Sequence, residues 1–150
     1  MIRQFHLLQQ LEKQFYWLKK VPFFPILFDE SLKLFTYVFK PQTFYQMSLL
    51  CNQLKQLPNI ERRYHPFGGL EFTVNNKEFA HLHGNGLLDV ILNKEIKESL
   101  IQKDFVELHH VHSNSSLISI YLNSKSDISE IYKVVCQAYS LQSQKGVSYN

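Results

Sequence analysis

Six of the seven histidines in this chain of 150 residues lie between positions 65 and 112. They comprise one isolated residue and two compact groups: His65, then His81 and His83, then His109, His110 and His112. Imidazole titrates nearest to neutral pH of all side chains, and it acts in proteins as an acid, a base and a metal ligand. Four of the five glycines fall in the same stretch, where the backbone must turn or approach another group closely. We therefore expect any chemistry of this chain to lie here.

His81 and His83 stand two residues apart in a segment whose alternating pattern predicts a strand. Side chains two apart leave the same face of a sheet, at a separation of roughly 7 Å. These two imidazoles can therefore serve one site. We predict a catalytic set and a substrate-binding set: His81, His83 and His109 for catalysis, and Asp89, His110, Arg62 and Arg63 for binding.

Several roles are open to these histidines. A metal site needs a third protein ligand, for which His109, His110 and Asp89 are the candidates. An enzyme without a metal would use a neutral imidazole as general base. A binding pocket without turnover would use the imidazoles, with Arg62 or Arg63, to hold an anionic or aromatic ligand. In a structural role, the histidines would pack between sheet and helix, hydrogen-bonded to backbone carbonyls or carboxylates. We expect no cofactor, and no metal for folding, because the chain has enough apolar mass for its own core.

Apolar residues at helical spacing predict three helices before Pro58. They cover residues 2–18, a segment that Asp29 caps and that ends before Pro41, and residues 43–57. After Pro58 the pattern alternates, which predicts strands over 70–74, 78–83, 87–92, 106–111 and 117–122. Two further helices are expected, one over 94–103 capped by Asn93 and one over 128–141 capped by Asp127.

These elements predict an α+β fold, with an antiparallel sheet of four to five strands packed with helices and an N-terminal helical arm. The Asn75-Asn76 pair and the Gly84-Asn85-Gly86 segment supply tight turns between the strands. We expect residues 1–40 to form the arm, residues 41–143 the α+β domain and residues 144–150 a polar tail.

The composition suits one domain, with 45% hydrophobic and 14% aromatic residues. The net charge of +3 comes from 16 basic and 13 acidic residues without a one-sided run, so no nucleic-acid partner is expected. Cys51 and Cys136 lie far apart in apolar helical patterns, which indicates reduced thiols. With no secretory signal at its start, the chain is expected to be cytoplasmic.

The most apolar window runs from Val21 to Phe39, but prolines and charged residues interrupt it, so it does not predict a membrane-spanning helix. An amphipathic helix packed on the domain is the favoured interpretation. Peripheral membrane contact through this arm is the alternative. The oligomeric state is not predicted.

Residues 67–141 resemble the luciferase-domain family, a group of small bacterial and fungal proteins that includes the light-emitting enzyme of bioluminescent fungi. The motifs that carry this resemblance are Phe67-Gly68-Gly69-x-Glu71-Phe72, Lys77-Glu78-Phe79-Ala80-His81-Leu82-His83-Gly84-x-Gly86-Leu87-x-Asp89, the pair His109-His110 and Ala138-Tyr139. The resemblance implies a cofactor-independent addition of dioxygen to a small hydroxypyrone, with His81 or His83 as base and a second imidazole stabilising the enolate. A deprotonated, electron-rich substrate is what that reaction requires.

Our hypothesis from the sequence is therefore an oxygenase-like enzyme that acts on a small enolic or aromatic substrate through a histidine site. The alternative is a non-catalytic small-ligand-binding or structural α+β module. A DNA-binding module is the third choice, because the order of elements resembles a small α+β "double wing" family, a likeness of fold alone.

Overall fold

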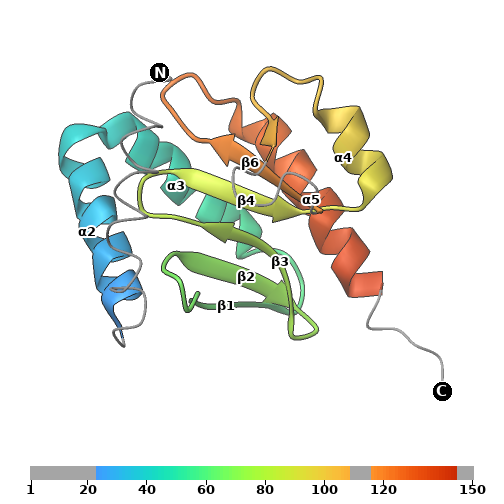
Figure 1. Cartoon of the computed structure of the whole chain (residues 1–150), viewed down its shortest axis with the longest axis horizontal. Coiled ribbons are helices and arrows are strands. Elements are labelled where there is room, and N and C mark those ends of the chain that lie inside the picture. Colours follow the sequence, from blue (N-terminus) through green and yellow to red (C-terminus); the bar gives the residue numbers. More distant parts are fainter. Residues whose placement is uncertain (1–22, 109–115, 145–150) are drawn as a thin grey trace.

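The computed structural model describes residues 23–108 and 116–144 (Figure 1). Its helices are α2 (Phe24–Phe39), α3 (Pro41–Leu54), α4 (Lys94–Leu100) and α5 (Ile128–Gln144). Its strands are β1 (Ile60–Tyr64), β2 (Leu70–Val74), β3 (Lys77–Leu82), β4 (Leu87–Ile91), β5 (Glu107–Leu108) and β6 (Leu117–Tyr121). Within the described residues these strands form one antiparallel sheet in the order β1-β2-β3-β4-β6-β5. The predicted α+β fold is confirmed.

One face of the sheet carries the hydrophobic core and is covered by α3 and α5, which lie behind the strands in Figure 1. Four side chains in one cross-strand row are completely buried: Phe72, Ala80, Val90 and Ile118. Leu50 and Leu54 from α3, and Val135 and Ala138 from α5, close the core above them. Each fully buried large apolar side chain contributes about 1.5–3 kcal/mol, so this face holds the domain together.

The opposite face carries a row of polar residues, because successive side chains of a strand point to opposite sides. Each member of this row is the direct cross-strand partner of the next, and the row crosses all six strands: Arg63, Glu71, His81, Asp89, Ser119 and Glu107. Three of its central members, Glu71, Asp89 and Ser119, are buried. Buried polar groups need partners, so this row is where the fold must satisfy charge and hydrogen bonding.

The predicted turns are confirmed. Asn75 and Asn76 both have positive φ, as a two-residue turn between β2 and β3 requires. Between β3 and β4, the His83 N–H donates to the Leu87 carbonyl at 2.8 Å and the Gly86 N–H donates to the His83 carbonyl at 3.0 Å. Gly86 has a φ of 90°, a conformation that glycine adopts without strain. This tight turn fixes the position of His83 relative to β4.

Two predictions about the elements were wrong. Asp29 does not cap α2, because the helix begins earlier, at Phe24. Pro25 sits in its first turn, where a backbone N–H has no partner within the helix and its absence loses no hydrogen bond. The sheet has six strands in the described residues rather than four or five, because β1 pairs with β2 at the edge. Four of the five residues of β1 are exposed, so its sequence has no apolar alternation to signal a strand. The predicted helix over residues 2–18 lies outside the described residues.

Helix α2 buries polar side chains and exposes apolar ones, the reverse of an ordinary amphipathic helix. Its two buried residues, Asp29 and Thr36, are polar, whereas its exposed side chains include Leu27, Leu34 and Val38. The polar side of α2 packs against glycines. A Cβ at Gly84 would lie 2.6 Å from the Lys33 nitrogen, so helix and turn meet backbone to backbone. None of the helices in the described residues has the length and apolar content needed to cross a membrane.

Candidate functional site

Three side chains of the β3–β4 hairpin meet at the centre of the polar row. His81 Nε2 lies 3.1 Å from His83 Nε2 and 3.2 Å from Asp89 Oδ2. His83 Nε2 lies 3.6 Å from the same Asp89 oxygen. The sequence placed His81 and His83 on one face, and the structure brings them together with Asp89, the cross-strand partner of His81. We call these three residues the central triad.

Glu78 contacts the other ring nitrogen of His81, with 2.6 Å between Glu78 Oε1 and His81 Nδ1. Residues three apart on a regular strand point to opposite faces, but β3 contains a bulge. Thr73 pairs with Glu78 while its neighbour Phe72 pairs with Ala80, which leaves Phe79 as the extra residue. The bulge therefore turns Glu78 to the face of His81. Glu78 was not among the predicted site residues, because the motif does not reveal the bulge.

Asp29 of α2 contacts the other ring nitrogen of His83. Asp29 Oδ1 lies 3.4 Å from His83 Nδ1 and accepts a hydrogen bond from the Gly84 N–H at 2.9 Å. The Asp29 side chain is only 9% exposed, so the helix buries a carboxylate against the end of the hairpin. Asp29 was predicted as a helix cap, and nothing in the sequence relates it to residues more than fifty positions away.

Ser119 of β6 completes the surroundings of Asp89. The Ser119 hydroxyl donates to Asp89 Oδ1 at 2.5 Å, so the other carboxylate oxygen, Oδ2, is the one that faces the two imidazoles. Asp89 and Ser119 are 1% and 2% exposed. The carboxylate is therefore held in one orientation by a neighbouring strand.

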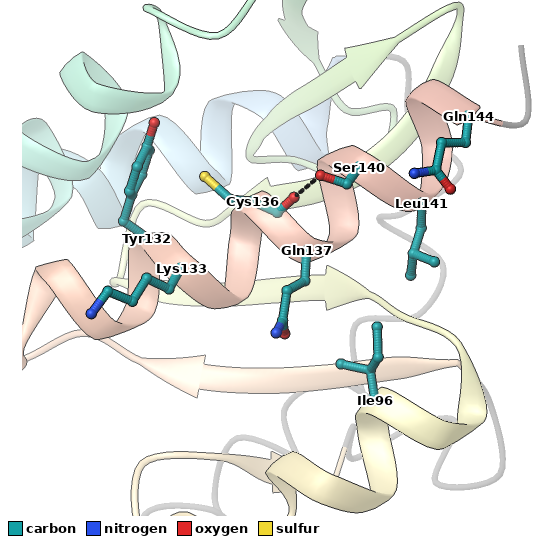
Figure 2. Close-up of a pocket in the computed structure, with 8 residues that line it drawn as sticks. All are labelled: Ile96, Tyr132, Lys133, Cys136, Gln137, Ser140, Leu141 and Gln144. Atoms are coloured by element: carbon teal, nitrogen blue, oxygen red, sulfur yellow. Dashed lines mark hydrogen bonds between the residues drawn. The ribbon is translucent and has the colours of Figure 1, made fainter. Parts of the chain in front are cut away.

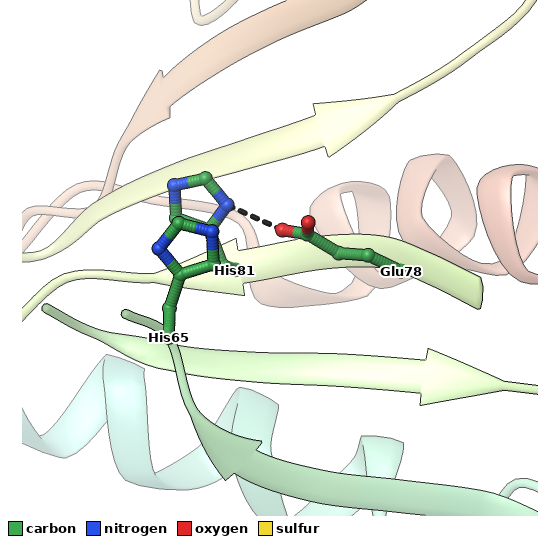
Figure 3. A group of neighbouring side chains, drawn as sticks. All are labelled: His65, Glu78 and His81. Atoms are coloured by element: carbon green, nitrogen blue, oxygen red, sulfur yellow. Dashed lines mark hydrogen bonds and ion pairs between the residues drawn. The ribbon is translucent and has the colours of Figure 1, made fainter. Parts of the chain in front are cut away.

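His65, which follows β1, stacks on His81 (Figure 3). The ring centroids are 4.8 Å apart and the planes are inclined by 13°. His65 Nδ1 accepts a hydrogen bond from the Phe67 N–H at 3.2 Å, and the side chain is partly exposed. His65 belongs to the histidine-rich stretch, but it was not among the predicted site residues, because the strand that precedes it has no apolar alternation.

The charges of the site are strongly coupled. Burial alone lowers the pKa of His81, but its contacts with Asp89 and Glu78 outweigh burial and raise the pKa to about 9. The pKa of His83 is also raised, since its contacts with Asp29 and Asp89 outweigh burial. Burial would raise the pKa of Asp89, yet the hydrogen bonds from His81, His83 and Ser119 hold it well below its usual range. The pKa of His65 is lowered by burial and by neighbouring His81.

The remaining predicted site residues lie elsewhere. Arg63 donates to Glu71 at 2.9 and 3.1 Å, so it belongs to the polar row with Glu71 between it and His81. Arg62 points to the other face of β1 and lines a cavity of about 240 Å³ beside α2 and α3. His109 and His110 lie outside the described residues.

A larger hollow, of about 360 Å³, lies between α4 and α5, and no residue of the central triad lines it (Figure 2). Ile96 of α4 and Cys136 of α5 are among its lining residues, and the Ser140 hydroxyl donates to the Cys136 carbonyl at 2.9 Å. Cys136 and Cys51 are both free thiols. The hollow has no cluster of carboxylates or imidazoles, so the central triad is the better candidate for chemistry.

No curated protein matches this chain. Residues 76–138 match the family model of the luciferase domain. This segment includes all three members of the central triad and the Glu78 and Ser119 side chains that contact them. The resemblance seen in the sequence is confirmed over this segment, and residues 76–138 belong to the luciferase-domain family.

Proposed function

We propose that this protein is an oxygenase-like enzyme that acts on a small enolic or aromatic substrate at the central triad. The observation that carries the proposal is the convergence of two imidazole nitrogens and a buried carboxylate oxygen within 3.6 Å of one another. Groups arranged in this way can hold positive charge beside a substrate oxygen, which stabilises an enolate. The luciferase domain of residues 76–138 supports the same reaction class.

The reaction adds both atoms of dioxygen to an enol, and no group leaves. The enol hydroxyl loses its proton to an imidazole that reaches solvent, and His65 and the 24%-exposed His83 are the two placed for this. The resulting enolate carbon gives electrons to dioxygen and forms a carbon–oxygen bond. The proton returns to the terminal oxygen, so the product is a hydroperoxide beside a carbonyl. Carbon is oxidised and dioxygen is reduced to the peroxide level.

The first prediction tests this reaction by oxygen uptake with a panel of hydroxypyrones and other small enols. We expect the wild type to consume oxygen and the His83→Ala variant to lose at least about 100-fold of that activity, the range that acid–base groups contribute. Glu98→Ala is the matched control, because the Glu98 side chain on α4 is 67% exposed.

Two results would count against the enzyme. Equal oxygen uptake by wild type and His83→Ala would show that the central triad does not carry the reaction. Panel compounds that bind to the wild type without oxygen uptake would favour the alternative, a small-ligand-binding module.

A further inference from the structure

We propose that the central triad is a binding site for one divalent transition-metal ion, with His81 Nε2, His83 Nε2 and Asp89 Oδ2 as its ligands. The inference concerns the same side chains as the proposed function but does not depend on turnover. It departs from the expectation, drawn from the sequence, of no cofactor, and it takes up the metal site that the sequence left open with Asp89 as a candidate third ligand.

The three ligand atoms form a triangle of a size that suits one ion. Its edges are 3.1, 3.2 and 3.6 Å. Ligand atoms at about 2.0–2.2 Å from one ion lie about 3.0 Å apart at octahedral angles and about 3.4 Å apart at tetrahedral angles. An ion therefore fits above the triangle with little movement of the side chains. Two histidines and one carboxylate on one side of an ion leave its other positions open to water or substrate.

The lone pairs of the three ligand atoms converge when both imidazoles are neutral. His81 Nδ1 faces Glu78 and His83 Nδ1 faces Asp29, and each carboxylate favours the neutral imidazole that carries its proton on Nδ1. Such an imidazole presents its Nε2 lone pair on the other side of the ring. A divalent ion therefore takes the place of the proton that otherwise lies between His81 Nε2 and Asp89 Oδ2, so that ion binding releases protons.

Each of the three ligands also has a partner that orients it. Metal-binding histidines commonly direct their second ring nitrogen to a carboxylate. His81 Nδ1 donates to Glu78 in this way, and His83 Nδ1 lies 3.4 Å from Asp29 Oδ1. Asp89 is fixed by the Ser119 hydroxyl on its other oxygen. The site also gathers three carboxylates around two imidazoles, all in a largely buried region, so a divalent ion would offset negative charge.

A competing set shares His81: His65, Glu78 and His81 also have potential ligand atoms within 4.8 Å of one another. His65, however, lies face to face with His81, and the lone pairs of an imidazole lie in the plane of its ring. His65 Nδ1 is also engaged by the Phe67 N–H. The geometry therefore favours the central triad, and His65 serves as the matched control.

The experiment is titration of Zn²⁺ and Co²⁺ into protein that carries no histidine tag and has been treated with a chelator. We expect the wild type to bind one equivalent of either ion, with visible absorption from bound Co²⁺. His83→Ala and Asp89→Asn should weaken Zn²⁺ binding at least about 100-fold, and Glu78→Gln about 10- to 100-fold, the usual effect of removing an orienting partner. His65→Ala should bind like the wild type. Circular dichroism checks folding, and His83→Ala decides the question if Asp89→Asn does not fold.

Unchanged Zn²⁺ affinity in His83→Ala would overturn the proposal, and so would a loss in His65→Ala as large as that in His83→Ala. Oxygen uptake by chelator-treated protein separates this proposal from the enzymatic one. If the chelator-treated protein consumes oxygen and the titration shows no bound ion, the ion site is overturned and the proposed enzyme stands. Stoichiometric ion binding without oxygen uptake would support the ion site and count against the enzyme.

Discussion

His81 is the residue on which the site depends, because its ring nitrogens lie closer to carboxylates than those of His83 do. Nδ1 contacts Glu78, and Nε2 contacts Asp89 and His83. Its side chain is 13% exposed, whereas that of His83 is 24% exposed. Two neighbouring imidazoles therefore differ in role: His81 links the cluster to its surroundings, and His83 borders the solvent.

This difference gives the second prediction, which concerns stability. His83→Ala, in metal-free protein, should lower the free energy of unfolding by less than about 1 kcal/mol. The His83 contacts with the two carboxylates, at 3.4 and 3.6 Å, are too long for strong hydrogen bonds, and its closer contact, at 3.1 Å, is with another imidazole. Urea denaturation measures the change. A loss of 2 kcal/mol or more would mean that His83 is mainly a structural residue.

The sequence alone predicts part of the central triad and little of its surroundings. His81 and His83 could be paired because side chains two apart on a strand share a face. Asp89 could be added because a short hairpin returns the chain beside them. Glu78 depends on a bulge, Asp29 on the docking of a helix, and His65 on a strand that carries no apolar alternation. Those positions follow from tertiary packing, which local pattern does not encode.

At the scale of elements, α2 is joined to the sheet through glycine. The Gly84 N–H donates to Asp29 Oδ1, and the space a side chain would need at Gly84 is filled by the backbone of α2 near Lys33. Gly68 meets the same helix, since a Cβ there would lie 2.6 Å from the Pro25 carbonyl oxygen. Helix α2 therefore positions Asp29 only as long as these turns carry no side chain.

The third prediction follows from this contact. Gly84→Ala should lower the free energy of unfolding by about 1–3 kcal/mol, the usual cost of forcing extra volume into a packed contact. Gly84 does not have positive φ, so the cost comes from the clash and not from backbone strain. Thermal melts beside the Glu98→Ala control would measure it. A variant as stable as the wild type would mean that α2 is free to move from the turn.

The elements that the sequence predicts well have strong local signals. Asn93 caps α4, with its side chain accepting from the Ile96 N–H at 2.9 Å. Asp127 caps α5 by accepting from the Ser129 and Glu130 N–H groups. Asp29 is also an aspartate, yet its side-chain oxygen accepts from the Gly84 N–H in the turn between β3 and β4. Residue type alone does not distinguish these two uses of a carboxylate.

At the scale of the whole molecule, the core lies between the sheet and helices α3 and α5, while α2 presents apolar side chains to the surface. Leu34 and Val38 are 63% and 56% exposed, and Leu50 of α3 is fully buried. The arm of residues 1–40, as a unit distinct from residues 41–143, stays a prediction. Peripheral membrane contact through this arm also stays a prediction.

The fourth prediction compares exposed apolar side chains of α2 with a buried one of α3. Leu34→Gln and Val38→Gln should each change the free energy of unfolding by less than about 0.5 kcal/mol, because neither side chain is buried and glutamine suits a helix. Leu50→Ala should cost about 2–5 kcal/mol through lost burial and a cavity. Chemical denaturation at low protein concentration gives the comparison. A large loss in Leu34→Gln would show that the exposed face of α2 contributes to folding.

The bulge at Phe79 also bears on how such a site can evolve. Because Glu78 and His81 share a face only through one extra residue, loss of a single position between them would turn Glu78 toward the core. Relatives that keep this arrangement should therefore keep the number of residues between Glu78 and His81 as well as these two side chains. Insertions and deletions should accumulate elsewhere, where a change of length does not exchange the two faces of the sheet.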